Sequence, residues 1–245
     1  MKRLFAALAL LALAAGAQAQ EGRGDRGGPR GGGQMRGYAN PSAAIAAEIA
    51  LARAAQDKGQ WTAARAAAAP DAAMFAPAMV LAHDWLKNRP DPPAALARQP
   101  YQVWSSCDGS LMITSGAWQR GDSHGWFTTV WQRQAKGGYK WVFDHHGAAR
   151  EPLPAPEMIA ARVAACPERR PGPRPAGQDA RGKPAKREKT PPMPFDPTRR
   201  EGRSDDGTLA WQVTADTAGT HDFTARMLVD GQMEEIRNEH VAAGA

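Results

Sequence analysis

The sequence has only two cysteines in 245 residues, and they lack the C-x-x-C spacing that is typical of structural metal sites. It also has no glycine-rich phosphate loop after a predicted strand and no H-E-x-x-H motif. These absences argue against the common nucleotide-dependent and zinc-protease mechanisms. After the first twenty residues, no apolar run is long enough to cross a bilayer. We therefore expect neither a cofactor nor a transmembrane segment.

The first nineteen residues have the three parts of a secretory signal peptide. Lys2 and Arg3 supply the basic part, residues 4–15 the apolar part, and residues 17–19 the small residues that a signal peptidase recognises. Twelve apolar residues are too few to span a bilayer core. We therefore expect cleavage near Ala19 and a periplasmic or secreted mature protein.

Export gives the two cysteines a structural role. An oxidising compartment favours a disulfide between a lone pair of cysteines. Cys107 and Cys166 are 59 positions apart. A bridge that closes a loop of that size contributes roughly 4 kcal/mol in the chain-entropy model. We expect this bridge rather than a reactive or metal-binding thiol.

Composition divides the mature chain into four segments. Residues 20–38 are rich in glycine and arginine and nearly free of apolar side chains, so we expect them to be disordered. Residues 39–166 have the length of a main domain. Residues 167–203 read as a disordered, basic, proline-rich linker. Residues 204–245 alternate like strands, which predicts a three-stranded β segment that either packs on the main domain or remains a flexible appendage.

The positive charge lies mostly outside the segments that we expect to fold. The chain has 31 basic and 25 acidic residues, and residues 167–203 alone hold eleven basic and five acidic ones. The expected folded parts are mildly acidic once the signal peptide and the basic segments are set aside. We therefore expect no nucleic-acid partner, although the linker could contact anionic envelope polymers.

Helical patterns open the main domain. Asn40 and Pro41 are typical of a helix start, and Gly59 is typical of a helix end. The expected inward face of this helix carries Ile45, Ile49 and Ala52. Further helices are expected at residues 61–69, 83–88 and 155–165, and an irregular apolar connection at residues 71–77.

From Tyr101 onwards the apolar pattern has the period of a strand. Residues 101–107 and 110–119 flank Asp108-Gly109, which is a strong hairpin signal. Residues 125–134 and 139–146 flank a four-residue loop and form a second hairpin. Helices followed by antiparallel strands predict an α+β domain with the helices on one face of a curved sheet.

These elements resemble the nuclear transport factor 2-like superfold, and most closely its SnoaL-like group of small exported bacterial domains. The likeness covers residues 40–147 and rests on DAAMFAP at 71–77 and on the strand motifs at 116–118, 130–134 and 139–144. It implies a cone-shaped, curved antiparallel sheet with a cavity between the sheet and the helices. Members include steroid isomerases, polyketide cyclases and domains that only bind ligands or partners. One fold carries many functions, so function must be argued from the site.

The register of the second hairpin assigns its side chains to two faces. A four-residue loop places Gln134 opposite Tyr139 and Thr129 opposite Asp144. The candidate cavity face holds Phe127, Thr129, Trp131, Val142, Asp144 and His146. The opposite face holds Val130, Gln132, Trp141, Phe143 and His145. Both faces are largely apolar, so we expect one to be covered by the helices and the other by another layer or a partner.

Asp144 is the main candidate for catalysis. Aromatic neighbours would raise its pKa by desolvation, as a general base near neutral pH requires. His146 could share its proton, and His83 could act as a gate or as a second acid–base group at the mouth of the cavity. The simpler alternative for Asp144 is a turn former at the end of a strand. For the segment His83-Asp84-Trp85 the simpler alternative is structural: Asp84 caps the short helix and Trp85 is a buried anchor.

The two adjacent histidines do not predict a metal site. Neighbouring residues of a strand point to opposite faces, so His145 and His146 cannot bind one ion unless the strand bends there. A metal site built from Asp144, His146 and the distant His83 is geometrically possible, but nothing else in the sequence supports it. No metal is expected.

Three functional hypotheses follow. The first is an exported module that binds a small apolar ligand or a protein partner without catalysis, with a homodimer through the sheet as one form of partner. The second is a cavity enzyme of the polyketide cyclase or ketosteroid isomerase type, in which Asp144 is the general base. The third is a structural, envelope-associated protein.

Overall fold

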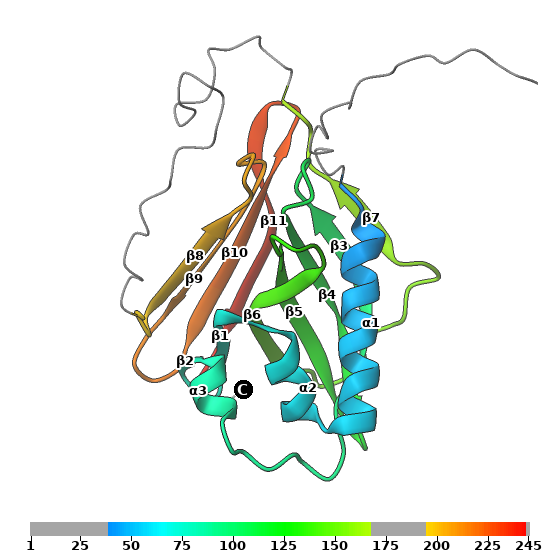
Figure 1. Cartoon of the computed structure of the whole chain (residues 1–245), viewed down its shortest axis with the longest axis vertical. Helices are drawn as coiled ribbons and strands as arrows, with labels where there is room; N and C mark the ends of the chain where they lie inside the picture. Colours follow the sequence, from blue (N-terminus) through cyan, green and yellow to red (C-terminus); the bar gives the residue numbers. More distant parts are fainter. Residues whose placement is uncertain (1–38, 168–194, 244–245) are drawn as a thin grey trace, which may run out of the picture. The chain divides into compact units, whose positions relative to one another are not determined.

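We describe a computed structural model of this chain for residues 39–167 and 195–243 (Figure 1). The predicted signal peptide and the glycine- and arginine-rich segment lie outside these residues, as does most of the predicted linker. Their assignments, and the proposed contact of the linker with envelope polymers, therefore remain predictions. Among the helices of the described residues, none combines the length and the apolar content that crossing a bilayer requires.

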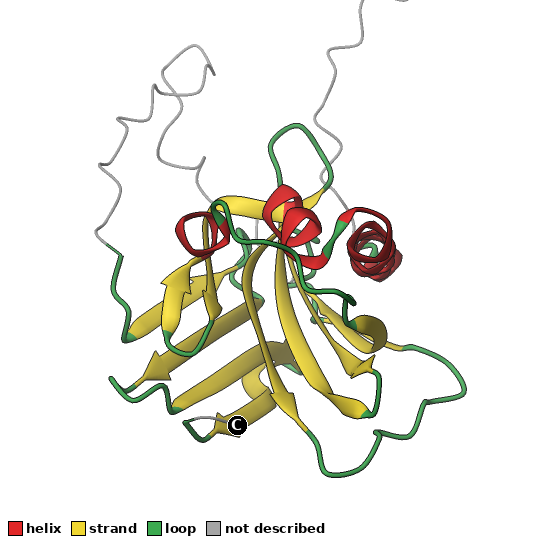
Figure 2. Cartoon of the chain, turned by 90° about the horizontal axis from the view of Figure 1, so that it is seen from below, coloured by secondary structure: helices red, strands yellow, loops and turns green. Residues whose placement is uncertain are grey.

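Three helices form where the sequence predicted them: α1 (Pro41–Lys58), α2 (Gln60–Ala67) and α3 (Ala82–Leu86). Gly59 separates the first two with a backbone φ of 99°, a value that favours glycine. The Asp91 carboxylate caps the start of α2, because Oδ1 accepts hydrogen bonds from the backbone N–H groups of Trp61 and Thr62. All three helices lie on one side of the strands (Figure 2).

Seven strands form the larger sheet, in the order β2-β1-β6-β5-β4-β3-β7. Their bounds are β1 (Ala68–Phe75), β2 (Met79–Leu81), β3 (Ala97–Ser105), β4 (Leu111–Arg120), β5 (Ser123–Arg133), β6 (Tyr139–Ala148) and β7 (Ala160–Val163). The two predicted hairpins are confirmed as β3–β4 and β5–β6. The sheet is mixed rather than antiparallel, because β1 runs parallel to β6 and β7 runs parallel to β3.

Two local predictions were wrong for a shared reason. Residues 71–77, expected to be an irregular connection, lie mostly in β1, and the helix expected at residues 155–165 contains β7 instead. Both strands pair in parallel with segments far away in the sequence. A short alanine-rich segment carries little strand propensity of its own, so the distant partner decides its conformation.

Four strands form a second, antiparallel sheet, in the order β11-β10-β9-β8. Their bounds are β8 (Arg199–Arg203), β9 (Leu209–Ala215), β10 (His221–Val229) and β11 (Gln232–Val241). The C-terminal β segment therefore has four strands rather than three. The additional strand, β8, lies within the segment expected to be linker, where its arginine-rich sequence shows no apolar alternation.

Aromatic side chains join the two sheets. Phe143 of β6 stacks on Trp211 of β9 at 5.2 Å and on Phe223 of β10 at 5.7 Å between ring centres. Phe143 and Phe223 are fully buried. The sheet face that we expected to be covered by another layer or by a partner is therefore covered by the chain's own β8–β11 sheet. A homodimer through the sheet remains a prediction.

Two turns with the same hydrogen-bond pattern interlock beside the disulfide. In the β3–β4 turn, Asp108 Oδ1 accepts hydrogen bonds from the side chains of Ser106 and Ser110. In the β8–β9 turn, Asp206 Oδ1 accepts them from Ser204 and Thr208. The turns are joined because the backbone N–H of Asp108 donates to Asp206 Oδ2 over 2.8 Å.

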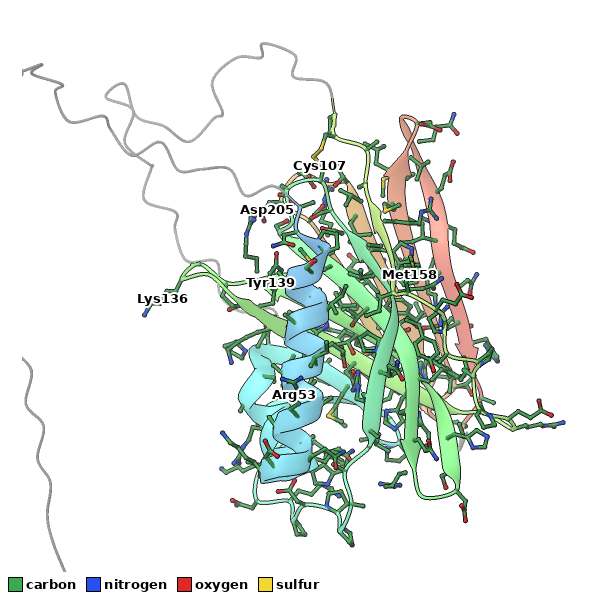
Figure 3. The ribbon with its side chains drawn as sticks, turned by 90° about the vertical axis from the view of Figure 1, so that its right-hand side faces the viewer. Arg53, Cys107, Lys136, Tyr139, Met158 and Asp205 are labelled. Atoms are coloured by element: carbon green, nitrogen blue, oxygen red, sulfur yellow. A yellow bond between two sulfur atoms is a disulfide. The ribbon has the colours of Figure 1, made fainter. Side chains whose placement is uncertain are left out.

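The predicted disulfide is confirmed. Cys107 in the β3–β4 turn is bonded to Cys166, with a Cα–Cα distance of 5.2 Å (Figure 3). The backbone N–H of Cys107 also donates to Thr208 Oγ1 over 2.9 Å. Covalent and hydrogen bonds therefore hold the segment after β7, the larger sheet and the smaller sheet together at one end.

Candidate functional site

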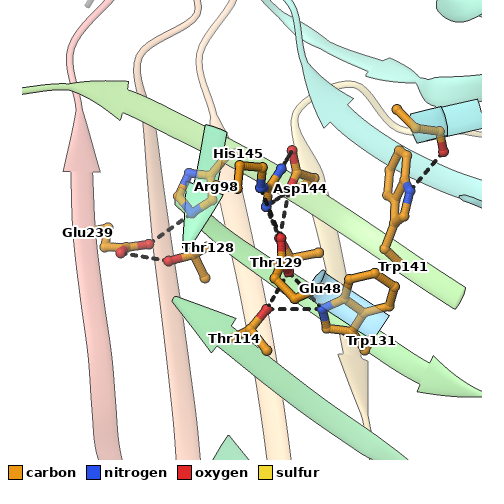
Figure 4. Close-up of polar contacts among 11 residues, drawn as sticks. Glu48, Arg98, Thr114, Thr128, Thr129, Trp131, Trp141, Asp144, His145 and Glu239 are labelled. Carbon is orange, nitrogen blue, oxygen red and sulfur yellow. Dashed lines mark hydrogen bonds and ion pairs between the residues drawn. The ribbon is translucent and has the colours of Figure 1, made fainter. Parts of the chain in front are cut away.

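Three polar side chains lie in a row across the helix-facing side of the larger sheet. Thr114 pairs with Thr129, and Thr129 pairs with Asp144, so the row crosses β4, β5 and β6. The Thr129 hydroxyl donates to Asp144 Oδ1 over 2.7 Å (Figure 4). The pairing of Thr129 with Asp144 confirms that part of the predicted hairpin register.

Arg98 of β3 neutralises Asp144. Its Nη2 and Nη1 atoms donate to the two carboxylate oxygens over 2.9 and 3.3 Å. Nη2 also donates to Thr129 Oγ1 over 2.5 Å. The guanidinium carbon lies 3.9 Å from the ring centre of Phe127, within the range of a cation–π contact. This bidentate arrangement fixes both charges in orientation as well as in distance.

Glu48 of α1 brings a second carboxyl group to the same guanidinium. Its Oε1 atom lies 2.9 Å from Arg98 Nε. Its Oε2 atom accepts hydrogen bonds from the Thr114 hydroxyl over 2.9 Å and from the Trp131 indole over 3.3 Å. The Glu48 side chain is fully buried. Two carboxyl groups thus share one guanidinium away from water, where an unbalanced charge is costly.

Sharing one guanidinium, the two carboxyl groups have pKa values that are shifted in opposite directions. Burial raises the pKa of Glu48; the charge of Arg98 opposes the rise, and the charge of Asp144 adds to it. Burial would also raise the pKa of Asp144, but the charge and the hydrogen bonds of Arg98 outweigh it and lower this pKa. The rise expected for Asp144 from its aromatic neighbours is therefore reversed. A proton taken up by this pair therefore binds more readily to Glu48 than to Asp144.

A small cavity of about 40 Å³ lies between α1, α2 and β6. Its apolar walls come mainly from Leu51, Ala55, Trp61, Ala64, Met74 and Trp141. Arg98, Asp144 and His146 supply polar groups. Burial lowers the pKa of His146, and the charge of Asp144 only partly opposes this, so the imidazole is held towards its neutral form. A space of this size holds a water molecule rather than a ligand unless side chains move.

The structure brings two of the three catalytic candidates together. Asp144 and His146 both line the cavity, whereas His83 of α3 does not. Three residues expected to line it lie on the same side of the sheet but serve the charged cluster instead: Phe127 contacts Arg98, Thr129 bonds to Asp144, and Trp131 bonds to Glu48.

A bulge in the second hairpin explains why Val142, the fourth residue expected to line the cavity, does not line it. Arg133 pairs with Tyr139, one residue away from the expected register, and the irregularity between Val130 and Trp131 restores the register further along. Trp141 therefore pairs with Trp131 and lines the cavity, while Val142 does not. The Trp141 indole donates to the Ala64 carbonyl oxygen of α2 over 2.9 Å, which fixes this wall.

Sequence reasoning missed Glu48 and Arg98. Glu48 lies within the buried stripe of α1, between Ala44 and Leu51. Ile49, which we expected to face inward, is 37% exposed. A carboxylate within a helical apolar stripe was the available signal, since such a group requires a buried partner. Arg98 carried no comparable local signal.

An open groove of about 600 Å³ lies beside the cavity, along α1. Its walls also come from Ala94, Ala95, Ala97, Arg98 and residues 119–121. Ala52 and Arg98 line both the groove and the cavity. The two spaces therefore share a wall.

A second buried polar cluster links the sheets on the opposite face. His145 Nε2 lies 2.8 Å from the Glu239 carboxylate, and His145 Nδ1 lies 3.1 Å from His221 Nε2. His221 Nδ1 faces the Gly219 carbonyl oxygen at 3.1 Å and must donate to it, so its Nε2 accepts from His145. Burial lowers the pKa of His221 to about 4. His145 thus points away from Asp144, as the alternation of the strand predicted.

Two other kinds of site can be assessed from the geometry. The pentapeptide at residues 121–125, Gly-Asp-Ser-His-Gly, has the spacing of a serine-hydrolase motif. Its first two residues form the turn between β4 and β5 and its last three begin β5, whereas that motif requires a strand followed by a helix. Within residues 39–167 and 195–243, no group of three or more His, Cys, Asp or Glu side chains is arranged to hold a metal ion.

No protein-family model matches this sequence, and a search of curated proteins returned no match.

Proposed function

We propose that this chain is an exported module that binds a small, mainly apolar molecule along α1. The observation that carries the proposal is the common wall of Ala52 and Arg98 between the cavity and the groove. The cavity alone is too small for a ligand, but the groove of about 600 Å³ is within the range of known ligand sites, roughly 300–1,000 Å³. The Cys107–Cys166 disulfide supports export, because such bonds persist in oxidising compartments.

The buried charges suit binding better than catalysis. Arg98 is held between two carboxyl groups and is oriented by Thr129 and Phe127, so it forms a rigid polar end to an otherwise apolar site. Ligand sites commonly combine apolar walls with a few oriented polar groups of this kind. Asp144 accepts three hydrogen bonds, two from Arg98 and one from Thr129.

Native mass spectrometry of the full chain, purified from the exported fraction, tests this proposal. We expect a small molecule bound in a 1:1 ratio. Ala52→Phe, which fills the common wall, should release it, and Ala50→Phe, on the exposed side of the same helix, should retain it. A wild-type protein that carries no molecule and shows no thermal shift with apolar probes would contradict the proposal.

A proton-transfer enzyme that uses Asp144 as its base is the second candidate. It is favoured by the shared cavity of Asp144 and His146. This mechanism requires the Asp144 carboxylate to leave Arg98 and to titrate near neutral pH. A carboxyl titration by NMR distinguishes the two candidates: a pKa of Asp144 below its ordinary value excludes the base, whereas a value near 7 supports it.

A further inference from the structure

The groove along α1 carries positive charge without a balancing carboxylate. Its charged lining residues are Arg53, Arg98 and Arg120, and none of its lining residues is acidic. Arg98 is already paired with Glu48 and Asp144. The charge that remains for a ligand therefore comes from Arg53 and Arg120.

These two arginines reach the groove from different elements. Arg53 lies in the C-terminal half of α1 (Figure 3), and Arg120 is the last residue of β4; both are exposed. The acidic residues nearest to them in sequence, Asp57 and Asp122, do not line the groove. Within the described residues, 39–167 and 195–243, no ion pair within 4 Å involves Arg53 or Arg120.

The remainder of the groove is aliphatic. Its lining includes Ala52, Ala94, Ala95 and Ala97, whose short side chains leave the space open. Ile49 is one of the few large apolar side chains in the described residues that is more than one third exposed. An exposed isoleucine above alanines provides contact area for a hydrocarbon chain.

We propose that this groove binds a small organic anion with an aliphatic body, and that Arg53 and Arg120 hold its anionic group. Guanidinium groups bind carboxylates through paired, charge-assisted hydrogen bonds, which gives the charged end of the ligand a fixed position. The aliphatic body lies on Ile49 and Ala52 and points towards the common wall of the cavity. This assignment rests on the proposed function and adds the charge class of the ligand to it.

Calorimetric titration of the full-length mature protein with octanoate and with 1-octanol tests the assignment. These probes share one hydrocarbon chain and differ in charge. We expect octanoate to bind with a Kd about tenfold or more below that of 1-octanol at low salt, and the difference to shrink as salt screens the charges. The double variant Arg53→Gln/Arg120→Gln should bind both probes equally. The matched control Arg203→Gln/Arg226→Gln, on the smaller sheet, should retain the preference.

The outcomes separate this assignment from the proposed function. If both probes bind with the same Kd and Ala52→Phe abolishes binding, the site exists but the anion assignment is wrong. If octanoate is preferred equally in wild type and in Arg53→Gln/Arg120→Gln, these arginines do not hold the anion, and the assignment is also wrong. If neither probe binds, both the assignment and its premise fail.

Discussion

The guanidinium of Arg98 donates to both carboxylate oxygens of Asp144, at 2.9 and 3.3 Å, although β4 and β5 separate their strands in the sheet order. Glu48 approaches the same guanidinium from α1 at 2.9 Å. The charged cluster therefore joins a helix to two non-adjacent strands. Breaking the cluster should therefore lower the stability of the protein, and protonation of its carboxyl groups should change how that stability depends on pH.

Arg98→Met should destabilise the protein strongly. Removing the guanidinium leaves Asp144 and Glu48 buried without a counter-charge, and breaking a buried ion pair costs about 3–5 kcal/mol. Urea denaturation at pH 7 measures the loss. The matched control is Arg199→Met, whose ion pair with Glu201 is more than half exposed and should contribute below about 1 kcal/mol. Equal effects of the two substitutions would contradict the importance of the cluster.

Glu48→Gln should change how stability depends on pH. Because the pKa of Glu48 is raised in the folded state, folding retains a proton that the unfolded chain releases above its ordinary pKa. This contribution to stability is present below pH 4.5, the ordinary value, and decreases as the pH rises towards the folded-state pKa. Glu48→Gln should therefore gain stability relative to wild type over that range. The exposed control Glu201→Gln should show no such gain over wild type. If the stability of Glu48→Gln followed the same pH profile as that of Glu201→Gln, the raised pKa of Glu48 would be refuted.

His221→Gln should remove an acid sensitivity. Burial lowers the pKa of His221 from 6.5 to about 4, so the unfolded chain binds a proton in this range that the folded chain does not. Wild-type stability should therefore decrease as the pH falls from 6.5 to about 4, by about 1–3 kcal/mol. His145, Asp222 and Glu239 are the titratable groups that act on His221. Thermal melts across this range measure the slope.

The control for this experiment is His240→Gln, because His240 is exposed and contacts Asp222 from β11. It should retain the wild-type slope between pH 6.5 and 4. The same slope in His221→Gln would show that His221 is not its source.

Glu239 affects stability in a lower pH range than His221. Burial raises its pKa, but His145 and Arg237 outweigh burial and hold the pKa below its ordinary value, so the contribution of Glu239 to stability is lost below about pH 4.5.

Removal of the disulfide should weaken the folded state without changing the strand pairing. Cys107→Ser/Cys166→Ser opens a loop of 59 residues, which costs about 4 kcal/mol in the chain-entropy model. Guanidinium denaturation of the variant, beside wild type with and without reductant, measures this loss. Reductant should bring the wild type to the level of the variant and leave the variant unchanged. Two free thiols in the unreduced wild type would contradict the bond itself.

Phe223→Ala should destabilise both sheets together. Phe223 is fully buried and stacks on Phe143 of the larger sheet, so its removal leaves a cavity at the interface and costs about 3–5 kcal/mol. Thr224→Ala, on the opposite side of β10, should cost less than about 1 kcal/mol. Tryptophan fluorescence and circular dichroism should give one coincident transition. Separate transitions would show that β8–β11 unfolds independently.

Local chemistry was sufficient to predict α1, α2, α3 and the two hairpins of the larger sheet. Pro41 and Gly59 bound α1, and Asp108-Gly109 lies in the turn from β3 to β4, because these residues set the backbone directly. The disulfide followed from a count of two cysteines. The alternation of the second hairpin correctly placed Thr129 opposite Asp144 and separated His145 from His146.

Contacts between distant residues decided the site. Arg98 is at least 46 positions away in the sequence from both Glu48 and Asp144. No local pattern in the sequence links these three residues. Their proximity reversed the pKa direction expected for Asp144. The bulge in the second hairpin places Trp141 rather than Val142 at the cavity, where the Trp141 indole bonds to the Ala64 carbonyl oxygen of α2.

The sequence by itself determined where most helices and hairpins form, because capping residues, turn residues and apolar period act within a few positions of the chain. Only the tertiary structure decided which faces are covered, by what, and which charges meet. Strands β1 and β7 form because of distant parallel partners, and the β8–β11 sheet covers the face that holds Phe143 and His145. Burial and electrostatic coupling are properties of the packed assembly of elements, so they appear only when those elements are brought together.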